Sequence, residues 1–408
     1  MTAARQRWFA AVESNTTGSG RKFCAAARAR GLRPVVLAKD PARYPYIAED
    51  GLDALVVDTS DLDAVRDACR GLLEGDGLAG VTSSSEYFVG TAAAVAHGLG
   101  LPAPDAAAIA RCRDKSAQRA ALAAAGVPVP AFRAVRDADG AVRAAAEIGC
   151  PVVLKPVSGS GSVGVRLCHD ATDVHAWATG LLGDWTNERG VPGGGTILVE
   201  EYVDGPEFSV ETFDAEVVGV VGKHVGRPPY FVETGHDVPA PVPEPQLSAL
   251  GAGARAAITA LGLTWGAAHT ELRLGPRGPV VIEANPRLAG GMIPELVQLA
   301  LGVDLVDAVV ARACGLPCAH TPAAVAHAAI RFLLAPGAGT VTAVDGVREA
   351  RGLPGVREVR IGVRPGDAVT VQHSFKDRLG FVIATGSDAA TAARRAAAAA
   401  ECIRCELR

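Results

Sequence analysis

The sequence has few aromatic residues and no long apolar run. Aromatic residues make up 5% of the chain, and no stretch of about eighteen consecutive apolar residues occurs, so a membrane-spanning helix is not expected. No cluster of lysine and arginine is interleaved with aromatic residues, and the formal net charge is -4, which argues against a nucleic-acid-binding surface. These absences favour a small-molecule partner.

Cysteine is present but forms no pattern that indicates a disulfide framework or a bound metal. The nine cysteines are an odd and scattered set. Cys402 and Cys405 have redox-like spacing, but no second pair of ligands lies nearby. No Ser-His-Asp or Cys-His constellation has support either, so a covalent nucleophile on the protein is not expected. The apolar stretch from Trp8 to Val12 is too short for a signal-peptide core, which predicts a cytoplasmic protein.

The length of 408 residues predicts two or three packed units. Residues 1–105 begin with an apolar run from Trp8 to Val12, a helical segment and a second run from Pro34 to Ala38. This order of strand, helix and strand is typical of a parallel sheet, so we expect an open α/β domain. Pro102 and Pro104 mark its end.

Residues 106–325 form the second predicted unit, in which strands alternate with loops. Several apolar runs predict strands, and the last two alternate as antiparallel strands do. These runs cover residues 151–156, 165–168, 196–203, 208–212 and 217–221. Residues 225–245 read as a proline-rich loop that is long enough to be functional.

Residues 326–408 form the third predicted unit. Short strands and glycine turns follow one another there, and an alanine-rich helix starts near Asp388. We expect a small α+β domain, whose purpose as lid, pocket wall or dimer contact the sequence leaves open.

A glycine-rich loop separates the first two strands of the second unit. Residues 159–164 match G-x-G-x-x-G, but residues 165–168 alternate as a strand does, whereas a dinucleotide fingerprint needs a helix there. We interpret residues 158–164 as a flexible flap whose backbone N–H groups and serine hydroxyls lie against phosphate oxygens. Lys155 would add positive charge at the same phosphates. An ordinary glycine-rich hairpin turn is the alternative for the segment taken alone.

Two glutamates oppose each other in a predicted hairpin. A glycine turn centred on Arg277 places Glu271 opposite Glu283, on the same face as Asn285. Opposed like charges destabilise a sheet, and a divalent cation removes this conflict. Two carboxylates and an amide oxygen are hard ligands suited to Mg²⁺ bound to nucleotide phosphates. A solvated pair in another register is the alternative.

Together these elements resemble the ATP-grasp superfamily. Asp114 with Lys115, Lys155 before the flap, residues 199–203, and Glu271 with residues 283–287 follow its order and spacing. The resemblance spans about residues 1–400. It implies an α/β fold, α+β overall, with an N-terminal Rossmann-like open parallel sheet, a central ATP-grasp lid and palm with the lid at about residues 125–203, and a small C-terminal α+β domain.

The resemblance also implies an activity, that of an ATP-dependent carboxylate-amine ligase. Such an enzyme forms an amide or peptide bond through an acyl phosphate and releases ADP and phosphate. The implied cofactors are ATP and Mg²⁺, with Mn²⁺ as a substitute. The substrates would be an amino acid or related small carboxylic acid and an amine, in amino-acid or natural-product metabolism. The resemblance leaves room for a homodimer.

For the nucleotide, the resemblance implies contacts from both sides of the flap. Lys115 and Lys155 would hold the ATP α- and β-phosphates, and Glu207 would bind the ribose hydroxyls. The flap and the strand that joins the two nucleotide-binding halves would supply the other contacts. These contacts are Ser158, Gly159, Ser160, Gly161, Ser162, Glu200, Glu201, Tyr202 and Val203.

For the reaction, the resemblance implies a metal site and a catalytic arginine. Glu271, Glu283 and Asn285 would be the magnesium ligands. Arg287 would stabilise the acyl phosphate and the tetrahedral oxyanion, together with Lys155 and backbone groups of Gly290 and Gly291.

Within the superfamily, two segments resemble bacterial L-amino acid ligases that make dipeptides or amidated natural products. The first follows the initial strand and includes Ser14 and Asn15, and the second includes Glu233 and His236. These residues, with Arg287 and Gly291, would line the amino-acid pocket. For the neighbouring Lys223 and His224, we expect a surface position at least as much as a position in this pocket.

Other functions fit parts of this pattern. A phosphotransferase that stops at the acyl phosphate would use the same flap and metal ligands, although a kinase places its lysine after the loop and Lys155 precedes it. A ligase with a carrier-protein-bound substrate and a non-enzymatic nucleotide-sensing module are further alternatives. ADP formation that depends on both an acid and an amine would separate a ligase from these.

Overall fold

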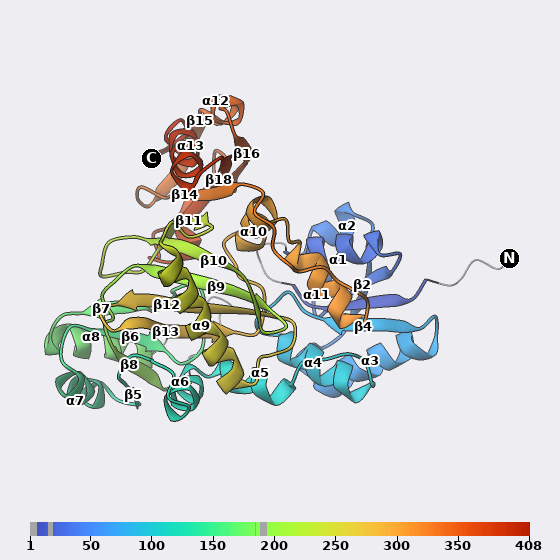
Figure 1. Ribbon diagram of the computed structural model, residues 1–408, viewed down its shortest axis with the longest axis horizontal. Coiled ribbons are helices and arrows are strands. Elements are labelled where there is room, and N and C mark those ends of the chain that lie inside the picture. Colours follow the sequence, from blue (N-terminus) through green and yellow to red (C-terminus); the bar gives the residue numbers. More distant parts are fainter. Residues whose placement is uncertain (1–5, 15–18, 184, 188–193) are drawn as a thin grey trace.

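The computed structural model describes residues 6–14, 19–183, 185–187 and 194–408. Asn15, which was expected to contact substrate, lies outside the described residues. The mixed α/β and α+β architecture that the sequence predicts is confirmed, with one parallel sheet and otherwise antiparallel sheets in the described part of the chain (Figure 1).

The N-terminal unit is a parallel sheet with helices on both faces, as expected. The strand order is β3-β2-β1-β4, and β1 pairs in parallel with both β2 and β4. Successive side chains of β1 point to opposite faces, so Ala10 and Val12 pack under α3 and α4 while Phe9 and Ala11 pack under α1 and α11. The elements are β1 (Trp8–Val12), α1 (Ser19–Ala29), β2 (Arg33–Ala38), η1 (Pro41–Arg43), α2 (Tyr46–Glu49), β3 (Asp53–Val56), α3 (Leu62–Glu74), β4 (Leu78–Thr82) and α4 (Val89–Gly98).

The lid is a smaller antiparallel sheet with order β5-β8-β6-β7. Helices α7 and α8 share one hydrophobic core with β6 and β8, so they cover one face of it. The glycine loop joins β6 to β7, which confirms that it connects two strands and not a strand to a helix. Helices α5 (Ala106–Arg113) and α6 (Lys115–Ala124) precede the lid. The elements of the lid are β5 (Phe132–Val135), α7 (Ala138–Ile148), β6 (Val152–Pro156), β7 (Arg166–Cys168), α8 (Ala171–Leu182) and β8 (Ile197–Glu201).

The palm and the C-terminal segment share one antiparallel sheet. Its order among the described residues is β13-β12-β9-β10-β11-β14-β18-β16. Strands β14, β16 and β18 lie after residue 325, so the sheet continues across the predicted limit between the second and third units; the domain limits themselves stay predictions. The strands are β9 (Glu207–Phe213), β10 (Glu216–Val225), β11 (Glu233–Val238), β12 (Ala267–Gly275), β13 (Gly278–Asn285), β14 (His327–Leu334), β16 (Val356–Ile361) and β18 (Arg378–Gly386).

Strand β11 corrects the expectation of a continuous loop over residues 225–245. Its sequence contains threonine, glycine, histidine and aspartate, and lacks the regular apolar alternation that indicates a strand. It forms because β10 and β14 pair with it on both sides, and β14 lies far downstream in the sequence. Pairing with β10 and β14 therefore outweighs the weak local strand propensity of β11.

Helices cover both faces of the shared sheet. Helix α9 (Glu244–Leu261) packs against β12 and β13 on one face of the sheet. Helix α10 (Ile293–Leu301) packs against the other face, near β14. The expected alanine-rich helix is α13 (Ala389–Glu401), whose N-terminus is capped by the side chain of Asp388. The remaining elements are α11 (Leu305–Ala313), β15 (Gly339–Asp345), α12 (Val347–Gly352), β17 (Ala368–Val369), η2 (Phe375–Asp377) and β19 (Arg404–Leu407).

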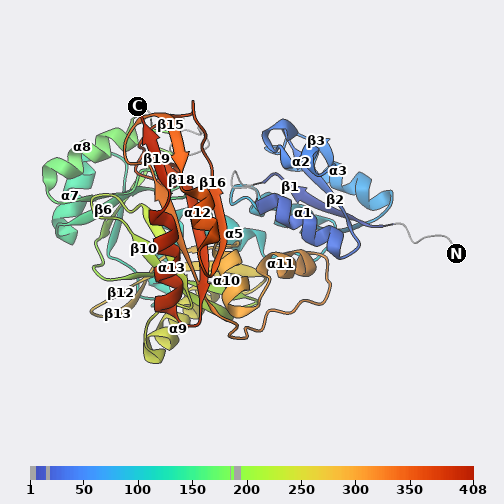
Figure 2. The ribbon, with the colours of Figure 1, turned by 90° about the horizontal axis from the view of Figure 1, so that it is seen from above.

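The chain returns to the N-terminal unit after the palm. Helix α11 packs on α1, where Val306 and Val310 share a core with Phe9, Phe23 and Ala27. Seen from above, the C-terminal strands lie between the lid helices and the N-terminal unit (Figure 2). Residues from all three units line one cavity. In the part of the chain that the structure describes, no helix is long and apolar enough to cross a bilayer.

Arg119 on α6 connects the lid to the palm. The residue is 1% exposed, and its Nε donates to Glu200 Oε1 on β8 at 2.8 Å. Its other guanidinium nitrogens donate to the carbonyl oxygens of Val281 at 3.2 Å and Ile282 at 2.6 Å on β13. One buried side chain thus satisfies acceptors from two sheets.

We expect Arg119→Ala to lower the free energy of unfolding by about 3–5 kcal/mol, because the buried Glu200 would lose one of its two cations and two backbone carbonyls of β13 would lose this donor. Urea-induced unfolding measures the loss. The control is Arg143→Ala, whose side chain is 69% exposed and 3.8 Å from Asp137, and which should change the stability by less than about 0.5 kcal/mol. Similar losses for the two variants would contradict the connecting role.

Candidate active site

A cavity of about 1240 Å³ lies where the three units meet. Residues from the N-terminal unit, such as Ser84 and Glu86, line it together with residues of the lid, the palm and the C-terminal segment. Typical small-molecule pockets measure roughly 300–1,000 Å³, so this cavity has room for more than one ligand.

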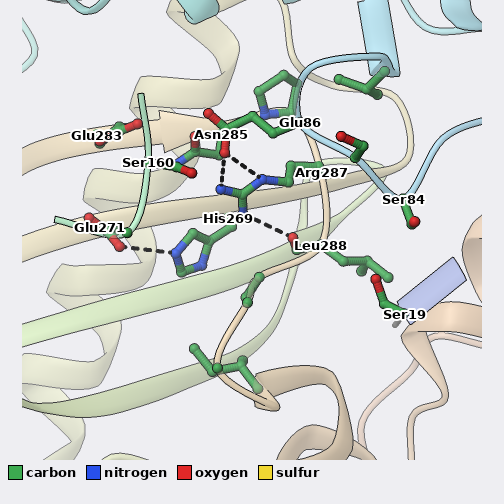
Figure 3. Close-up of a pocket in the computed structure, with 18 of the residues that line it drawn as sticks. Ser19, Ser84, Glu86, Ser160, His269, Glu271, Glu283, Asn285, Arg287 and Leu288 are labelled. Carbon is green, nitrogen blue, oxygen red and sulfur yellow. Dashed lines mark hydrogen bonds and ion pairs between the residues drawn. The ribbon is translucent and has the colours of Figure 1, made fainter. Parts of the chain in front are cut away.

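The predicted opposition of the two glutamates is confirmed, although a register shift between Glu271 and Leu272 places the turn between Gly275 and Gly278 and not centred on Arg277. Glu271 on β12 is opposite Glu283 on β13, and His269 is opposite Asn285. These side chains line the cavity, and Figure 3 shows the two glutamates beside Asn285 and Arg287. The two carboxylates therefore share one wall of the site, where their charges need compensation.

Lys223 on β10 supplies part of that compensation. Its Nζ lies 2.7 Å from Glu271 Oε1, 2.8 Å from Glu233 Oε1 and 2.9 Å from Glu207 Oε1. Burial would lower the pKa of Lys223, but the three carboxylates outweigh burial and hold that pKa well above its ordinary value. Lys223 is thus a buried residue of the site, and the expected surface position is wrong.

His269 is the second cation beside Glu271. Its Nδ1 lies 2.7 Å from Glu211 Oε1, and its Nε2 lies 3.2 Å from Glu271 Oε1. Burial would lower the pKa of His269, but the two glutamates outweigh it and raise the pKa to about 9. The ring is therefore protonated at neutral pH. Burial would raise the pKa of Glu271, yet Lys223 and His269 hold it well below its ordinary value.

The donor set at the hairpin fits a magnesium ion. Glu271, Glu283 and Asn285 offer two carboxylates and an amide oxygen, all hard oxygen donors. Among the described residues, no group of three or more His, Cys, Asp and Glu is arranged to hold a metal ion by itself. A cation here would therefore share its coordination with Asn285, water or phosphate oxygens, which is the pattern of Mg²⁺ and not of a structural zinc site.

Two lysines lie between the hairpin and the flap. Lys115 Nζ donates to the Gly159 carbonyl at 2.7 Å and lies 3.3 Å from Glu283 Oε1. Lys155 is buried, with Nζ 2.6 Å from Glu200 Oε2, and burial lowers its pKa although Glu200 opposes the shift. Of the predicted flap contacts, Gly159, Ser160, Gly161 and Ser162 line the cavity, whereas Ser158 is not among the lining residues.

The predicted adenine and ribose contacts lie from the end of β8 to the start of β9. Glu200, Glu201, Tyr202, Val203 and Glu207 all line the cavity. Burial would raise the pKa of Glu200, but Arg119 and Lys155 outweigh it and lower the pKa to about 2. Glu207 accepts from Arg273 Nε at 3.1 Å, and the same guanidinium donates to the Val203 carbonyl at 3.2 Å.

Arg287 is held by a glutamate of the N-terminal unit that the sequence interpretation missed. Its Nε donates to Glu86 Oε2 at 3.1 Å, and Arg113 Nη1 lies 2.6 Å from Glu86 Oε1. Burial would raise the pKa of Glu86, but Arg287, Arg113 and Lys115 outweigh it and lower the pKa to about 2. Figure 3 shows Arg287 bonded both to Glu86 and to the Leu288 carbonyl.

Glu233, His236 and Gly291 form another part of the cavity wall, next to the Phe332 ring. Arg378 of the C-terminal segment lies 2.6 Å from Glu233 Oε2 and stands over the Phe332 ring. Burial lowers the pKa of His236 to about 3, more than Glu233 can raise it, so the ring is neutral at pH 7. A Cβ at Gly291 would lie 2.6 Å from His236 Nε2, so only glycine fits there.

Of the two predicted substrate contacts that follow β1, only Ser14 lies in the described part of the chain. Ser14 is buried and is not a lining residue, although its Oγ lies 3.4 Å from Oγ of Ser84, which does line the cavity. Asn15 lies outside the described residues. Gly290 lines the cavity beside Gly291.

Comparisons with known proteins assign the chain to a family. Residues 148–295 match the ATP-grasp domain, and residues 331–408 match the L-amino acid ligase C-terminal domain 2. An uncharacterised protein of Sinorhizobium fredii is 40% identical over 93% of this chain and 78% of its own length. The chain belongs to the ATP-grasp superfamily.

Other members of the superfamily agree with this assignment. A D-alanine–D-alanine ligase of Desulforudis audaxviator is 28% identical over 73% of this chain and 88% of its own length. An L-amino acid ligase from Bacillus licheniformis has the same fold, with a TM-score of 0.80, 22% identity and full coverage of both chains. This ATP-grasp protein is an ATP-dependent ligase that forms amide bonds.

A further structural neighbour has a bound nucleotide. The biotin carboxylase domain of a 2-oxoglutarate carboxylase from Hydrogenobacter thermophilus has a TM-score of 0.71 and 18% identity, and covers 98% of this chain and 91% of its own. That structure is a dimer in complex with the magnesium salt of ADP. The Mn²⁺ alternative has no support from that structure.

Local sequence could have revealed some of the missed residues. His269 has the same strand parity as Glu271, so alternation alone places it on the cavity face of β12. Glu86 lies 201 residues from Arg287, and Arg378 lies 145 residues from Glu233. No local pattern links positions so far apart, because only the assembled sheet and the return of the chain bring them together.

We expect Lys223→Met to lower the free energy of unfolding at pH 7 by about 3 kcal/mol or more, because three carboxylates would lose their shared cation. Urea-induced unfolding in the presence of EDTA measures the change. The control is Lys39→Met, whose side chain is 68% exposed.

The pH dependence tests the cause of this loss. Glu233 and Glu271 have folded-state pKa values below the ordinary 4.5, so the stabilisation is fully present above about pH 4.5 and is lost as the pH falls through the folded-state values. The difference between wild type and Lys223→Met should therefore narrow below about pH 4.5. A difference that stays constant down to pH 3 would contradict the electrostatic explanation.

Proposed function

We propose that this ligase activates an amino acid or a related small carboxylic acid as an acyl phosphate and joins it to an amine. One observation carries the proposal: Glu271, Glu283 and Asn285 share a single cavity with Lys115, Lys155, the flap and Arg287. An acyl-phosphate ligase needs these parts together, because one carboxyl group receives the phosphoryl group on its oxygen and then the amine at its carbon.

The nucleotide would lie between the lid and the palm. Lys115 and Lys155 would bind the α- and β-phosphates, and the backbone of Gly159 to Ser162 would cover them. Backbone groups of Glu201 and Val203 would bind the adenine, beside Tyr202. Glu207 would accept hydrogen bonds from the ribose hydroxyls, a role that fits a carboxylate held by Arg273 and Lys223.

Magnesium would be held by Glu271, Glu283 and Asn285. When bound, it would neutralise charge on the nucleotide phosphates at the point of phosphoryl transfer. Within the protein, Lys223 and His269 then have a second effect, because they keep Glu271 ionised and so ready to act as a ligand.

The proposed reaction has two steps. A carboxylate oxygen of the first substrate attacks the γ-phosphorus of ATP, the bond to the β,γ-bridging oxygen breaks, and ADP leaves. The amine nitrogen of the second substrate then attacks the acyl carbon and loses a proton, and phosphate leaves as the C–O bond breaks. Arg287, with N–H groups of Gly290 and Gly291, would stabilise the oxyanion between these events.

The amino-acid pocket would be the part of the cavity formed by Glu233, His236 and Gly291. An ionised glutamate suits a substrate ammonium group, and the neutral His236 ring can accept or donate one hydrogen bond without added charge. The similarity to a D-alanine–D-alanine ligase supports amino acids as substrates. A carrier-protein-bound substrate and a homodimer stay predictions, as does the cytoplasmic location.

A screen of amino-acid pairs tests this function. Purified protein is incubated with ATP, magnesium and pairs of amino acids, and ADP, phosphate and the condensed product are measured. We expect ADP to form in equal amounts with an amide product, and only when both substrates and magnesium are present. ADP formation with an acid alone and no amine dependence would favour the phosphotransferase alternative.

Arg287→Ala tests the role of the guanidinium. We expect product formation to fall by at least about 10²-fold, as for loss of an oxyanion donor, while ATP binding measured by calorimetry changes little. Arg312→Ala is a suitable control, because Arg312 also lines the cavity but pairs with Asp214 at 3.1 Å, away from Glu86. Full product formation by Arg287→Ala would show that this role is wrong.

A further inference from the structure

Nearly all cations in the cavity wall are paired with carboxylates. Lys115 pairs with Glu283, Lys155 with Glu200, and Arg287 with Glu86. Lys376 is different: it lines the cavity, and in the described chain no carboxylate oxygen lies within 4.0 Å of its ammonium group. This side chain is exposed, so its charge is available to a ligand.

A rigid turn fixes the position of Lys376. The residue lies in η2 (Phe375–Asp377), where the backbone N–H of Lys376 donates to Ser374 Oγ at 3.3 Å. The Asp377 carboxylate accepts from the backbone N–H of Gln372 at 2.7 Å and of Ser374 at 3.3 Å. Ser374 and Asp377 are 0% and 5% exposed. These hydrogen bonds and the burial of the two side chains give the turn a defined conformation.

This turn rests on the flap. The backbone N–H of Phe375 donates to the Gly161 carbonyl at 3.4 Å, and a Cβ on Gly161 would lie 2.2 Å from the Phe375 ring. Beside this contact the His373 ring stacks on Tyr230, with centroids 3.9 Å apart. The C-terminal segment thus holds Lys376 beside the glycine loop that is proposed to cover the phosphates.

The distribution of lysine supports an anion at this position. The chain has six lysines, and all except Lys39 line the cavity. Lys115 contacts the flap at the Gly159 carbonyl, and Lys115 and Lys155 each have a carboxylate partner. A triphosphate brings more negative charge than these paired lysines can offset, and an ammonium group is a compact point charge well suited to a phosphoryl group.

We propose that Lys376 binds the terminal phosphoryl group of ATP beneath the flap, as a cation contributed by the C-terminal segment. This inference rests on the proposed function, since it assumes that the flap covers ATP. It would give the C-terminal segment a part in the reaction: the nucleotide site is incomplete until η2 meets Gly161. ADP lacks the terminal phosphoryl group, so Lys376 should distinguish ATP from ADP.

The test compares Lys376→Gln with Lys39→Gln, which removes the same charge from an exposed site outside the cavity. Calorimetry in excess magnesium measures the affinity for ADP and for the non-hydrolysable β,γ-imido analogue of ATP. We expect Lys376→Gln to weaken binding of the analogue by about tenfold or more, the effect of one lost charged hydrogen bond. ADP binding should stay within about twofold, and Lys376→Arg should recover most of the loss.

Other results would overturn the inference. Equal weakening of ADP and the analogue, or no weakening of either, would exclude contact with the terminal phosphoryl group. A raised KM for the amino acid with unchanged nucleotide affinity would assign Lys376 to the substrate carboxylate instead. These results differ from failure of the proposed function, in which the wild-type protein would bind nucleotide but form no amide product from any pair of amino acids.

Discussion

Mutual repulsion between Glu271 and Glu283 is the constraint on which the rest of the site depends. Two ionised carboxylates in opposed positions on a sheet are unfavourable unless cations lie close by. Lys223 and His269 lie against Glu271, and Lys115 lies near Glu283. Because Lys223 also contacts Glu207 and Glu233, one buried ammonium group connects the proposed ribose, metal and amino-acid contacts. A substitution at any one of these positions should therefore change the electrostatic environment of the others.

The continuous antiparallel sheet brings this network within reach of distant parts of the chain. Strand β11 carries Glu233 and His236 and lies between β10 of the palm and β14 of the C-terminal segment. The next strand, β18, begins at Arg378, which pairs with Glu233. The C-terminal segment is thus part of the wall of the site. Its turn at η2 also meets the flap at Gly161, so two parts of the cavity wall depend on residues that follow position 325.

Much of the fold could be predicted because its signals are local. Alternation and turn residues indicated the hairpin of β12 and β13, including the opposition of Glu271 and Glu283. The strand after Gly164 excluded a dinucleotide-binding fingerprint, and the helix capped by Asp388 begins where it was expected. Strand β11 was missed because its residues have weak strand propensity and its partners supply the stabilisation. Lys223 was misjudged for a related reason: its burial follows from three glutamates on three other strands.

The sequence by itself determined the order of the chemical parts: two lysines, a glycine flap, paired acids with an asparagine, and an arginine. It could do so because each part occupies a short segment whose residue types and spacing already restrict the chemistry. Only the tertiary structure decided the partners of these charges, such as Glu86 for Arg287 and Arg378 for Glu233. Electrostatic pairing and desolvation depend on distance in space, and the packing of α11 on α1 and the continuation of the sheet past residue 325 set those distances.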